Sequence, residues 1–130
     1  MIVPDASVIL DVLLQTPDAR RVEDRFLDDT ESLHAPHLLD VEVAQVLRRF
    51  VARGELPARR GREALELLAV FPLARYPHEP LLARIWALRG NLTAYDAAYV
   101  ALAEGLGATL LTRDRRLAAA PGHSARVELI

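Results

Sequence analysis

Four acidic residues lie near the ends of apolar runs or the starts of helical patterns: Asp5, Glu42, Asp96 and Asp114. The first acid follows an apolar run at 1–4, and the last follows a run at 108–112. The second and third acids lie in the early turns of helices that we expect over 37–53 and 93–104. In open parallel α/β sheets, ligands bind beyond the carboxyl ends of the strands. The spacing therefore predicts that the four carboxylates converge at one edge of a sheet.

Such a cluster of carboxylates needs a counter-charge, because like charges raise one another's pKa values. A divalent cation resolves the repulsion. The chain contains no cysteine and the donors are oxygens, so Mg²⁺ fits best and Mn²⁺ is expected to substitute for it. A metal held in this way activates water and stabilises charge on a phosphodiester during in-line displacement. The acids thus predict a metal-dependent phosphodiesterase site, which could hold one ion or two.

Structural roles compete with this interpretation. Aspartate is a preferred N-cap, so Asp5 and Asp114 could each cap a helix, and Thr93-x-x-Asp96 resembles a capping box. Capping and metal binding are compatible with each other. Glu42 has no arginine three or four residues further along, and a carboxylate beside an apolar stripe favours a metal or a distant cation as its partner. A solvated glutamate is the alternative at that position.

The elements that must position these acids alternate between short apolar runs and longer helical patterns. Strands are expected at 1–4, 32–35, 71–76, 108–112 and 126–130, and helices at 6–14, 17–28, 37–53, 57–70, 80–89, 93–104 and just after Asp114. This alternation predicts an α/β fold in one domain over 1–130, with a mostly parallel central sheet of four to five strands flanked by helices. Pro72 inside the third strand indicates an edge position.

Composition excludes several classes of function. The chain has 130 residues, and all 16 of its basic residues are arginine. The absence of lysine excludes a Walker A phosphate loop and Schiff-base chemistry. A net charge of −2 argues against a simple cationic nucleic-acid binder. The sequence shows neither a signal-peptide pattern nor a run long enough for a membrane span, so we expect a cytoplasmic protein without a membrane partner.

The sequence resembles the PIN-domain nucleases, and its size is similar to that of the VapC-like toxins of type II toxin–antitoxin systems. The matching segments are MIVPDASVILD at 1–11, Glu42 within its helix, TAYDAAYVALA at 93–103 and LLTRD at 110–114. The resemblance implies that the four acids are the catalytic and metal-binding residues of a ribonuclease. It also implies supporting roles for Ser7 beside the first acid and for Thr112 two residues before the last.

The resemblance further implies an RNA substrate, a VapB-like antitoxin partner and a homodimer. Three arginines beside the last acid are candidate RNA contacts, because guanidinium groups bind phosphate bidentately: Arg113, Arg115 and Arg116. A solvated helix start is their alternative role. Some family members carry a fifth acid shortly after the fourth, where this chain has Arg115 and Arg116, and this difference leaves a second metal position open. Tyr99 and Trp86 are expected to pack in the protein or at a dimer interface.

Two other functions stay open at this point. A non-catalytic binding module could keep the PIN fold and act through a protein partner, although such a module would not need all four acids. A DNA-directed nuclease could use the same metal chemistry. Titration with Mn²⁺ separates the first alternative from a nuclease, and a panel of RNA and DNA substrates separates the second.

Overall fold

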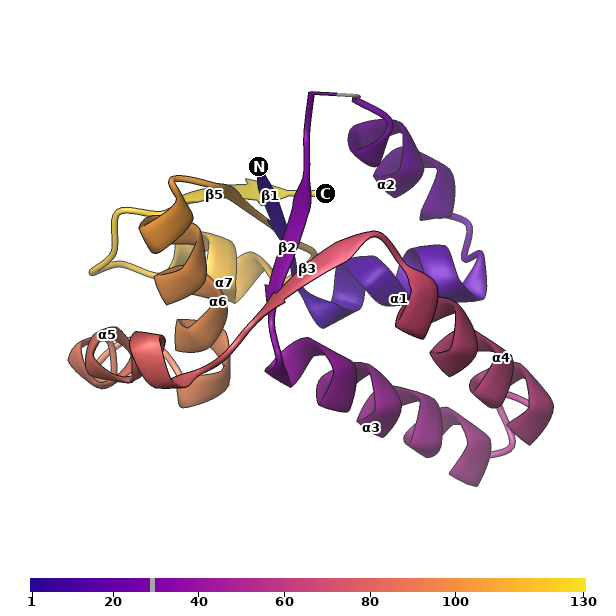
Figure 1. Cartoon of the computed structure of the whole chain (residues 1–130). Coiled ribbons are helices and arrows are strands. Elements are labelled where there is room, and N and C mark those ends of the chain that lie inside the picture. The colour runs from indigo at the N-terminus through magenta and orange to yellow at the C-terminus, as the bar shows by residue number, and fades with distance from the viewer. Residues whose placement is uncertain (29) are drawn as a thin grey trace.

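A single parallel sheet organises the protein, of which the computed structural model describes residues 1–28 and 30–130. Its five strands are β1 (Ile2–Pro4), β2 (Leu33–Pro36), β3 (Leu73–Tyr76), β4 (Thr109–Thr112) and β5 (Arg126–Leu129). They pair in the order β3-β2-β1-β4-β5, and every pair is parallel. The expected α/β fold with a parallel sheet flanked by helices is therefore confirmed (Figure 1).

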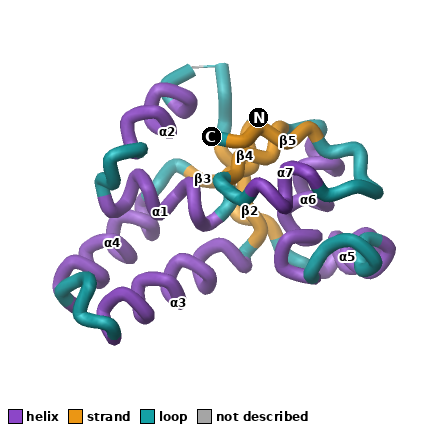
Figure 2. The backbone as a smooth tube through the Cα atoms, turned by 180° about the vertical axis from the view of Figure 1, so that it is seen from behind, coloured by secondary structure: helices purple, strands orange, loops and turns teal. Residues whose placement is uncertain are grey.

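The helices gather on two sides of this sheet. They are α1 (Ala6–Leu14), α2 (Ala19–Phe26), α3 (Leu38–Ala52), α4 (Ala58–Val70), the 3₁₀ turn η1 (Glu79–Leu81), α5 (Leu82–Ala87), α6 (Ala94–Leu106) and α7 (Arg115–Ala119). Figures 1 and 2, which view the molecule from opposite directions, show α1 to α4 on one side and α5 to α7 on the other. No described helix is long and apolar enough to cross a membrane.

The strand order places β1 at the centre of the sheet, and the chain adds strands first on one side of β1 and then on the other. From β1 the chain adds β2 and then β3 on one side, and it later returns to place β4 and β5 on the other. Loops that leave β1 and β4 therefore diverge at the carboxyl edge of the sheet, where open α/β proteins bind their ligands. Asp5 directly follows β1, and Asp114 lies two residues beyond β4.

Helix α6 is packed closely against the sheet by a run of small residues. Residues 97–103 are all buried, and four of these seven are alanine, which brings the helix backbone close to β1, β2 and β4. The strands β1 and β4 are buried along their whole length. Each fully buried branched aliphatic side chain contributes about 1.5–3 kcal/mol. The acid-bearing ends of β1, β4 and α6 are thus anchored in fully buried parts of the core.

The expected elements are all present, with differences at their ends. Helix α1 has the expected bounds, whereas α2 is shorter than the range 17–28 and leaves Pro17 outside. Strand β3 occupies the sheet edge as expected, but Pro72 precedes the strand and is not part of it. Proline has no N–H to offer a ladder, so pairing with β2 begins only at Leu73.

Candidate active site

The four acids predicted from the sequence line one cavity of about 310 Å³. The other residues around it are Ala6, Ser7, Tyr99 and Arg113. Asp5 reaches the cavity from the end of β1, and Asp114 from the loop between β4 and α7. Glu42 comes from the second turn of α3, and Asp96 from the first turn of α6. Four elements that lie far apart in the sequence therefore converge on the carboxyl edge of the sheet.

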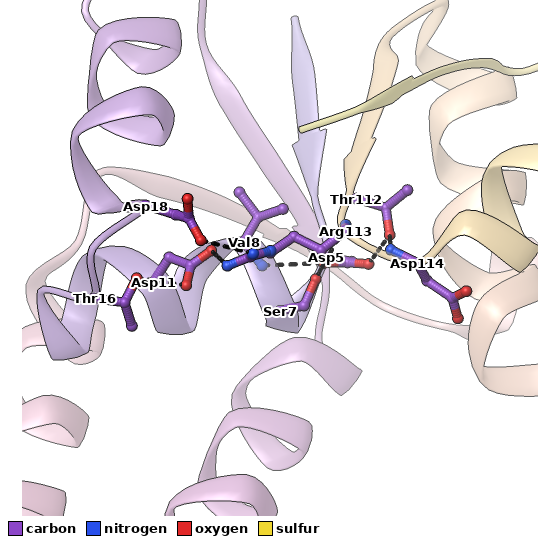
Figure 3. Close-up of polar contacts among 9 residues, drawn as sticks. All are labelled: Asp5, Ser7, Val8, Asp11, Thr16, Asp18, Thr112, Arg113 and Asp114. Atoms are coloured by element: carbon purple, nitrogen blue, oxygen red, sulfur yellow. Dashed lines mark hydrogen bonds and ion pairs between the residues drawn. The ribbon is translucent and has the colours of Figure 1, made fainter.

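Asp5 is nearly buried, with 9% of its surface exposed, and three donors hold its carboxylate. Its Oδ1 accepts the N–H of Val8 at 3.2 Å, which caps α1, and the hydroxyl of Ser7 at 2.5 Å. Its Oδ2 accepts the hydroxyl of the fully buried Thr112 (Figure 3). Burial raises the pKa of the Asp5 carboxyl, and these donors offset only part of the rise.

The two supporting hydroxyls also hold the loop that carries the last acid. Thr112 Oγ1 accepts the backbone N–H of Asp114 at 3.0 Å while donating to Asp5. Ser7 Oγ accepts the backbone N–H of Arg113 at 3.4 Å while donating to Asp5. Each hydroxyl therefore links the carboxylate at the end of β1 to the loop after β4 (Figure 3).

Asp114 caps α7, and its carboxylate is more open. Its Oδ1 accepts the N–H groups of Arg116 at 2.8 Å and Leu117 at 3.3 Å. The expected capping role of Asp114 is thus present, as it is for Asp5. Thr93 Oγ1 likewise accepts the N–H of Asp96 at 3.2 Å, which forms half of the expected capping box. The Asp96 carboxylate stays available to the cavity.

Glu42 has a partner that sequence reasoning missed. Its Oε1 accepts the hydroxyl of Tyr99 at 2.6 Å, across from α6. Burial raises the pKa of Glu42, and the charges of Asp5 and Asp96 raise it further, against the lowering effect of the tyrosine donor. The pKa of Tyr99 is itself raised by burial and by the Glu42 charge, so its hydroxyl stays protonated and donates. The signal available in the sequence was helix spacing: Tyr99 lies three residues after Asp96, so the two side chains share one face of the helix.

Asp96, which is half-buried like Glu42, also has a raised pKa. Burial raises the pKa of Asp96, and the charges of Asp114 and Asp5 raise it further. The Thr93 hydrogen bond and the charge of Arg116 lower the pKa of Asp96 and offset only part of this rise. Arg113 is the one basic side chain that lines the cavity within the described part of the chain, and its guanidinium pairs with acids outside it.

This donor set fits a hard divalent cation. Every donor is a carboxylate oxygen, which suits Mg²⁺ and Mn²⁺, and a bound cation would relieve the repulsion that raises the pKa values. Within residues 1–28 and 30–130, no three acids or histidines stand close enough to coordinate one ion as they are placed. Ion binding would therefore require the acidic side chains of the cavity to move closer together.

The three arginines predicted as RNA contacts have different surroundings. Arg113 Nη1 lies 2.7 Å from Asp11 in α1, and its Nη2 lies 2.7 Å from Asp18 in the turn between α1 and α2. Arg115 is exposed at the first residue of α7. The side chain of Arg116 is 96% exposed, and its Nε lies 4.0 Å from Asp114 Oδ1.

Comparison with known proteins identifies relatives over most of the chain. The family model described as PIN domain matches residues 2–122. Ribonuclease VapC9 of Mycobacterium tuberculosis is 49% identical over 117 residues, which cover 90% of this chain and 88% of that protein. The crystal structure of PAE2754 from Pyrobaculum aerophilum superposes with a TM-score of 0.71 at 27% identity, covering 97% of this chain and 81% of that one.

A likeness of fold extends to a toxin–antitoxin complex. A chain in the structure of VapBC2 from Rickettsia felis, bound to a DNA fragment from its promoter, superposes with a TM-score of 0.73 at 13% identity. The match covers 99% of this chain and 98% of that one. At this identity the likeness concerns the fold alone.

Proposed function

The chain belongs to the PIN-domain family and, within it, to the VapC ribonucleases, and on that premise we propose that it hydrolyses RNA phosphodiester bonds at the four-acid cavity. The observation that carries the proposal is the convergence of Asp5, Glu42, Asp96 and Asp114 on one cavity. We propose that these four residues hold Mg²⁺, with Mn²⁺ able to replace it. The whole chain, residues 1–130, is proposed to be one nuclease domain.

The bound cation would activate a water and neutralise charge on the phosphodiester. Four unneutralised carboxylates would repel a phosphate, so the acids alone do not bind substrate. The chain's own contribution is to hold the acids in place. Ser7 and Thr112 orient the Asp5 carboxylate, and the Tyr99 hydroxyl fixes Glu42 from α6.

RNA is proposed to approach along the start of α7. Arg115 and Arg116 present exposed guanidinium groups there, and such groups bind phosphate oxygens bidentately. A second cavity of about 230 Å³ shares Asp96 and Asp114 with the acid cavity and is also lined by Asn91 and Arg116. This arrangement supports a bound strand that continues past the acids.

We propose that a VapB-like antitoxin controls this activity and that the chain forms a homodimer. The family membership and the fold likeness to a VapBC complex support the antitoxin. Trp86 and Leu82 on α5 are 69% and 55% exposed, which supports an apolar contact with another protein chain. A cytoplasmic location stays a prediction.

The test is cleavage of total cellular RNA by purified, antitoxin-free protein with Mg²⁺, with Mn²⁺ and with EDTA. Discrete fragments that require metal are expected from the wild type. They should vanish in Asp5→Asn and in Asp96→Asn, while circular dichroism shows both variants folded. Asp24→Asn, at an exposed position of α2, is the matched control and should cleave like the wild type. Full activity in both acid variants would refute the assignment.

Two further measurements separate the alternatives. Calorimetric titration with Mn²⁺ should show site-specific uptake that Asp96→Asn loses, whereas a non-catalytic binding module would show none. Single-stranded RNA, structured RNA and DNA in parallel assays should give cleavage of RNA only. Cleavage confined to DNA would make the chain a DNA-directed nuclease.

A further inference from the structure

A buried acid outside the four-acid cavity has an arginine from the site loop as its partner. Asp11, in the middle of α1, is 5% exposed. Its Oδ1 accepts the hydroxyl of Thr16 at 2.7 Å, and its Oδ2 accepts Arg113 Nη1 at 2.7 Å. An ionised carboxylate is costly to bury unless a counter-charge and hydrogen bonds satisfy it. Arg113 supplies that counter-charge.

The same guanidinium holds a second acid. Arg113 Nη2 lies 2.7 Å from Asp18 Oδ2, in the turn between α1 and α2. One planar guanidinium therefore spans two carboxylates, which a lysine ammonium could not match in geometry. Figure 3 shows the Arg113 side chain directed toward Asp11 and Asp18, away from Asp114.

The location of Arg113 in the chain makes this contact relevant to the site. It stands between Thr112, whose hydroxyl binds Asp5, and Asp114, which caps α7. Its own backbone N–H binds Ser7 Oγ at 3.4 Å. The ion pair with Asp11 and these hydrogen bonds join the end of β4 and the loop after it to α1 and its Asp5 cap. The ion pair with Asp18 joins the same loop to the turn that follows α1.

We propose that Arg113 is a positioning residue, which locks the β4–α7 loop against α1 through Asp11 and Asp18 and so fixes Asp114 and Thr112 relative to Asp5. The inference rests on the proposed nuclease function. It gives Arg113 a role that differs from the RNA contact expected from the sequence, because swinging the guanidinium toward a phosphate would leave Asp11 buried without its counter-charge. Arg116, with its exposed side chain, is under no such constraint.

The test is a double-mutant cycle of Arg113→Gln, Asp11→Asn and the combined variant, with Arg53→Gln as the matched control. Arg53 is an exposed arginine at the C-cap of α3, and its substitution changes the net charge equally. Three properties are measured: Mn²⁺ affinity by calorimetry, single-turnover cleavage, and affinity for a single-stranded RNA oligonucleotide in EDTA at several salt concentrations. Melting temperature in EDTA monitors the fold.

Each single variant should weaken Mn²⁺ binding and slow cleavage by about tenfold, the lower end of the effect of losing a direct partner of a metal ligand, because Arg113 and Asp11 act through the loop and contact none of the four acids. RNA affinity in EDTA and its salt dependence should stay within twofold of the wild type. The combined variant should be no worse than the poorer single variant, because removing both charges leaves no unpaired ion. Arg113→Lys should recover only part of the loss, and Arg53→Gln should match the wild type.

A different pattern would overturn the proposal. If Arg113→Gln weakens RNA binding, lowers the salt slope by about one and leaves Mn²⁺ affinity intact, Arg113 contacts a phosphate instead. Additive losses in the combined variant would also overturn it. A wild type that neither binds Mn²⁺ nor cleaves RNA would overturn the proposed function and the positioning role together. If the wild type is active and Asp11→Asn has the same Mn²⁺ affinity and cleavage rate as the wild type, the positioning role alone would be overturned.

Discussion

Replacing Tyr99 by phenylalanine removes a single hydroxyl from the site and leaves the core packing in place. The ring of Tyr99 is 2% exposed among the buried residues of α6, and phenylalanine fills the same space. Only the donor to Glu42, at 2.6 Å, is lost. Glu42 would then have no protein donor among its described contacts, while Asp5 and Asp96 continue to repel it.

The expected magnitude follows from this geometry. A hydrogen bond to a charged group contributes about 1.5–3 kcal/mol to stability. Water can replace part of the lost contact because Glu42 is only half-buried, so we expect a loss of about 1–2 kcal/mol. In a domain of this size, that loss lowers the melting temperature by about 4–8 °C. Mn²⁺ affinity and the cleavage rate should fall by about tenfold.

The pH dependence of the loss identifies its cause. The Tyr99 hydroxyl lowers the pKa of Glu42, so its contribution to stability exists where Glu42 is ionised and disappears as the pH falls through that pKa. Urea unfolding in EDTA should therefore show a gap between Tyr99→Phe and wild type at pH 7 that closes at acidic pH. The acid limb of the cleavage profile should also move to higher pH in the variant.

Tyr95→Phe is the matched control, because it removes the same atom from the same helix. Tyr95 lies one turn earlier and is 62% exposed. Its substitution should change stability by less than about 0.5 kcal/mol, as is usual for exposed sites, and leave Mn²⁺ affinity unchanged. If Tyr99→Phe behaves like Tyr95→Phe in all three assays, the Glu42 contact has no energetic role and the reasoning is refuted.

Three other perturbations follow from the same contacts. Asp96→Asn should gain stability relative to the metal-free wild type as the pH rises above the ordinary aspartate pKa of 3.8, because the raised pKa of Asp96 makes its ionisation unfavourable in the folded state. Urea titrations in EDTA measure the difference in free energy of unfolding between variant and wild type. The same difference at every pH would contradict this prediction. Thr112→Val should cost about 1–3 kcal/mol and weaken Mn²⁺ binding, because it removes a buried donor to Asp5; Thr112→Ser should restore both. Arg84 binds Glu104 at 2.7 and 2.9 Å and lowers its pKa to about 2. Arg84→Gln should therefore lower the melting temperature at pH 7, and this loss should become smaller as the pH falls from 4.5 toward 2. Equal losses at pH 7 and at pH 2 would argue against a stabilising ion pair.

Local sequence signals predicted the elements well but not their neighbours in the sheet. The bounds of α1 are set by the Asp5 cap at one end and by the left-handed Gln15 at the other, and both lie within a few residues of the apolar pattern. Strand order has no comparable signal. Nothing in the apolar run at 108–112 indicates that β4 pairs with β1 and not with β3, since that choice depends on how α6 packs across the sheet.

The convergence of the four acids on one cavity could be predicted because each stands near a recognisable element boundary. Their partners could not, because they come from distant parts of the chain. The contact from Tyr99 to Glu42 spans 57 residues, and the contact from Arg113 to Asp11 spans 102. Spacing rules detect pairs three or four residues apart. Tyr99 was therefore expected only to pack, and Arg113 was expected to face solvent and RNA.

Capping and the proposed metal binding, which compete as explanations in the sequence, are compatible in the geometry of Asp5 and Asp114. Asp114 accepts both of its capping N–H groups with Oδ1, so its cap does not use Oδ2. Asp5 accepts its cap with Oδ1 and the Thr112 hydroxyl with Oδ2, and each oxygen offers two lone pairs. The caps thus hold the ligand oxygens in place. Asparagine caps helices as well as aspartate does but carries no charge, so Asp→Asn should remove the metal and keep the helix, whereas Asp→Ala should weaken both.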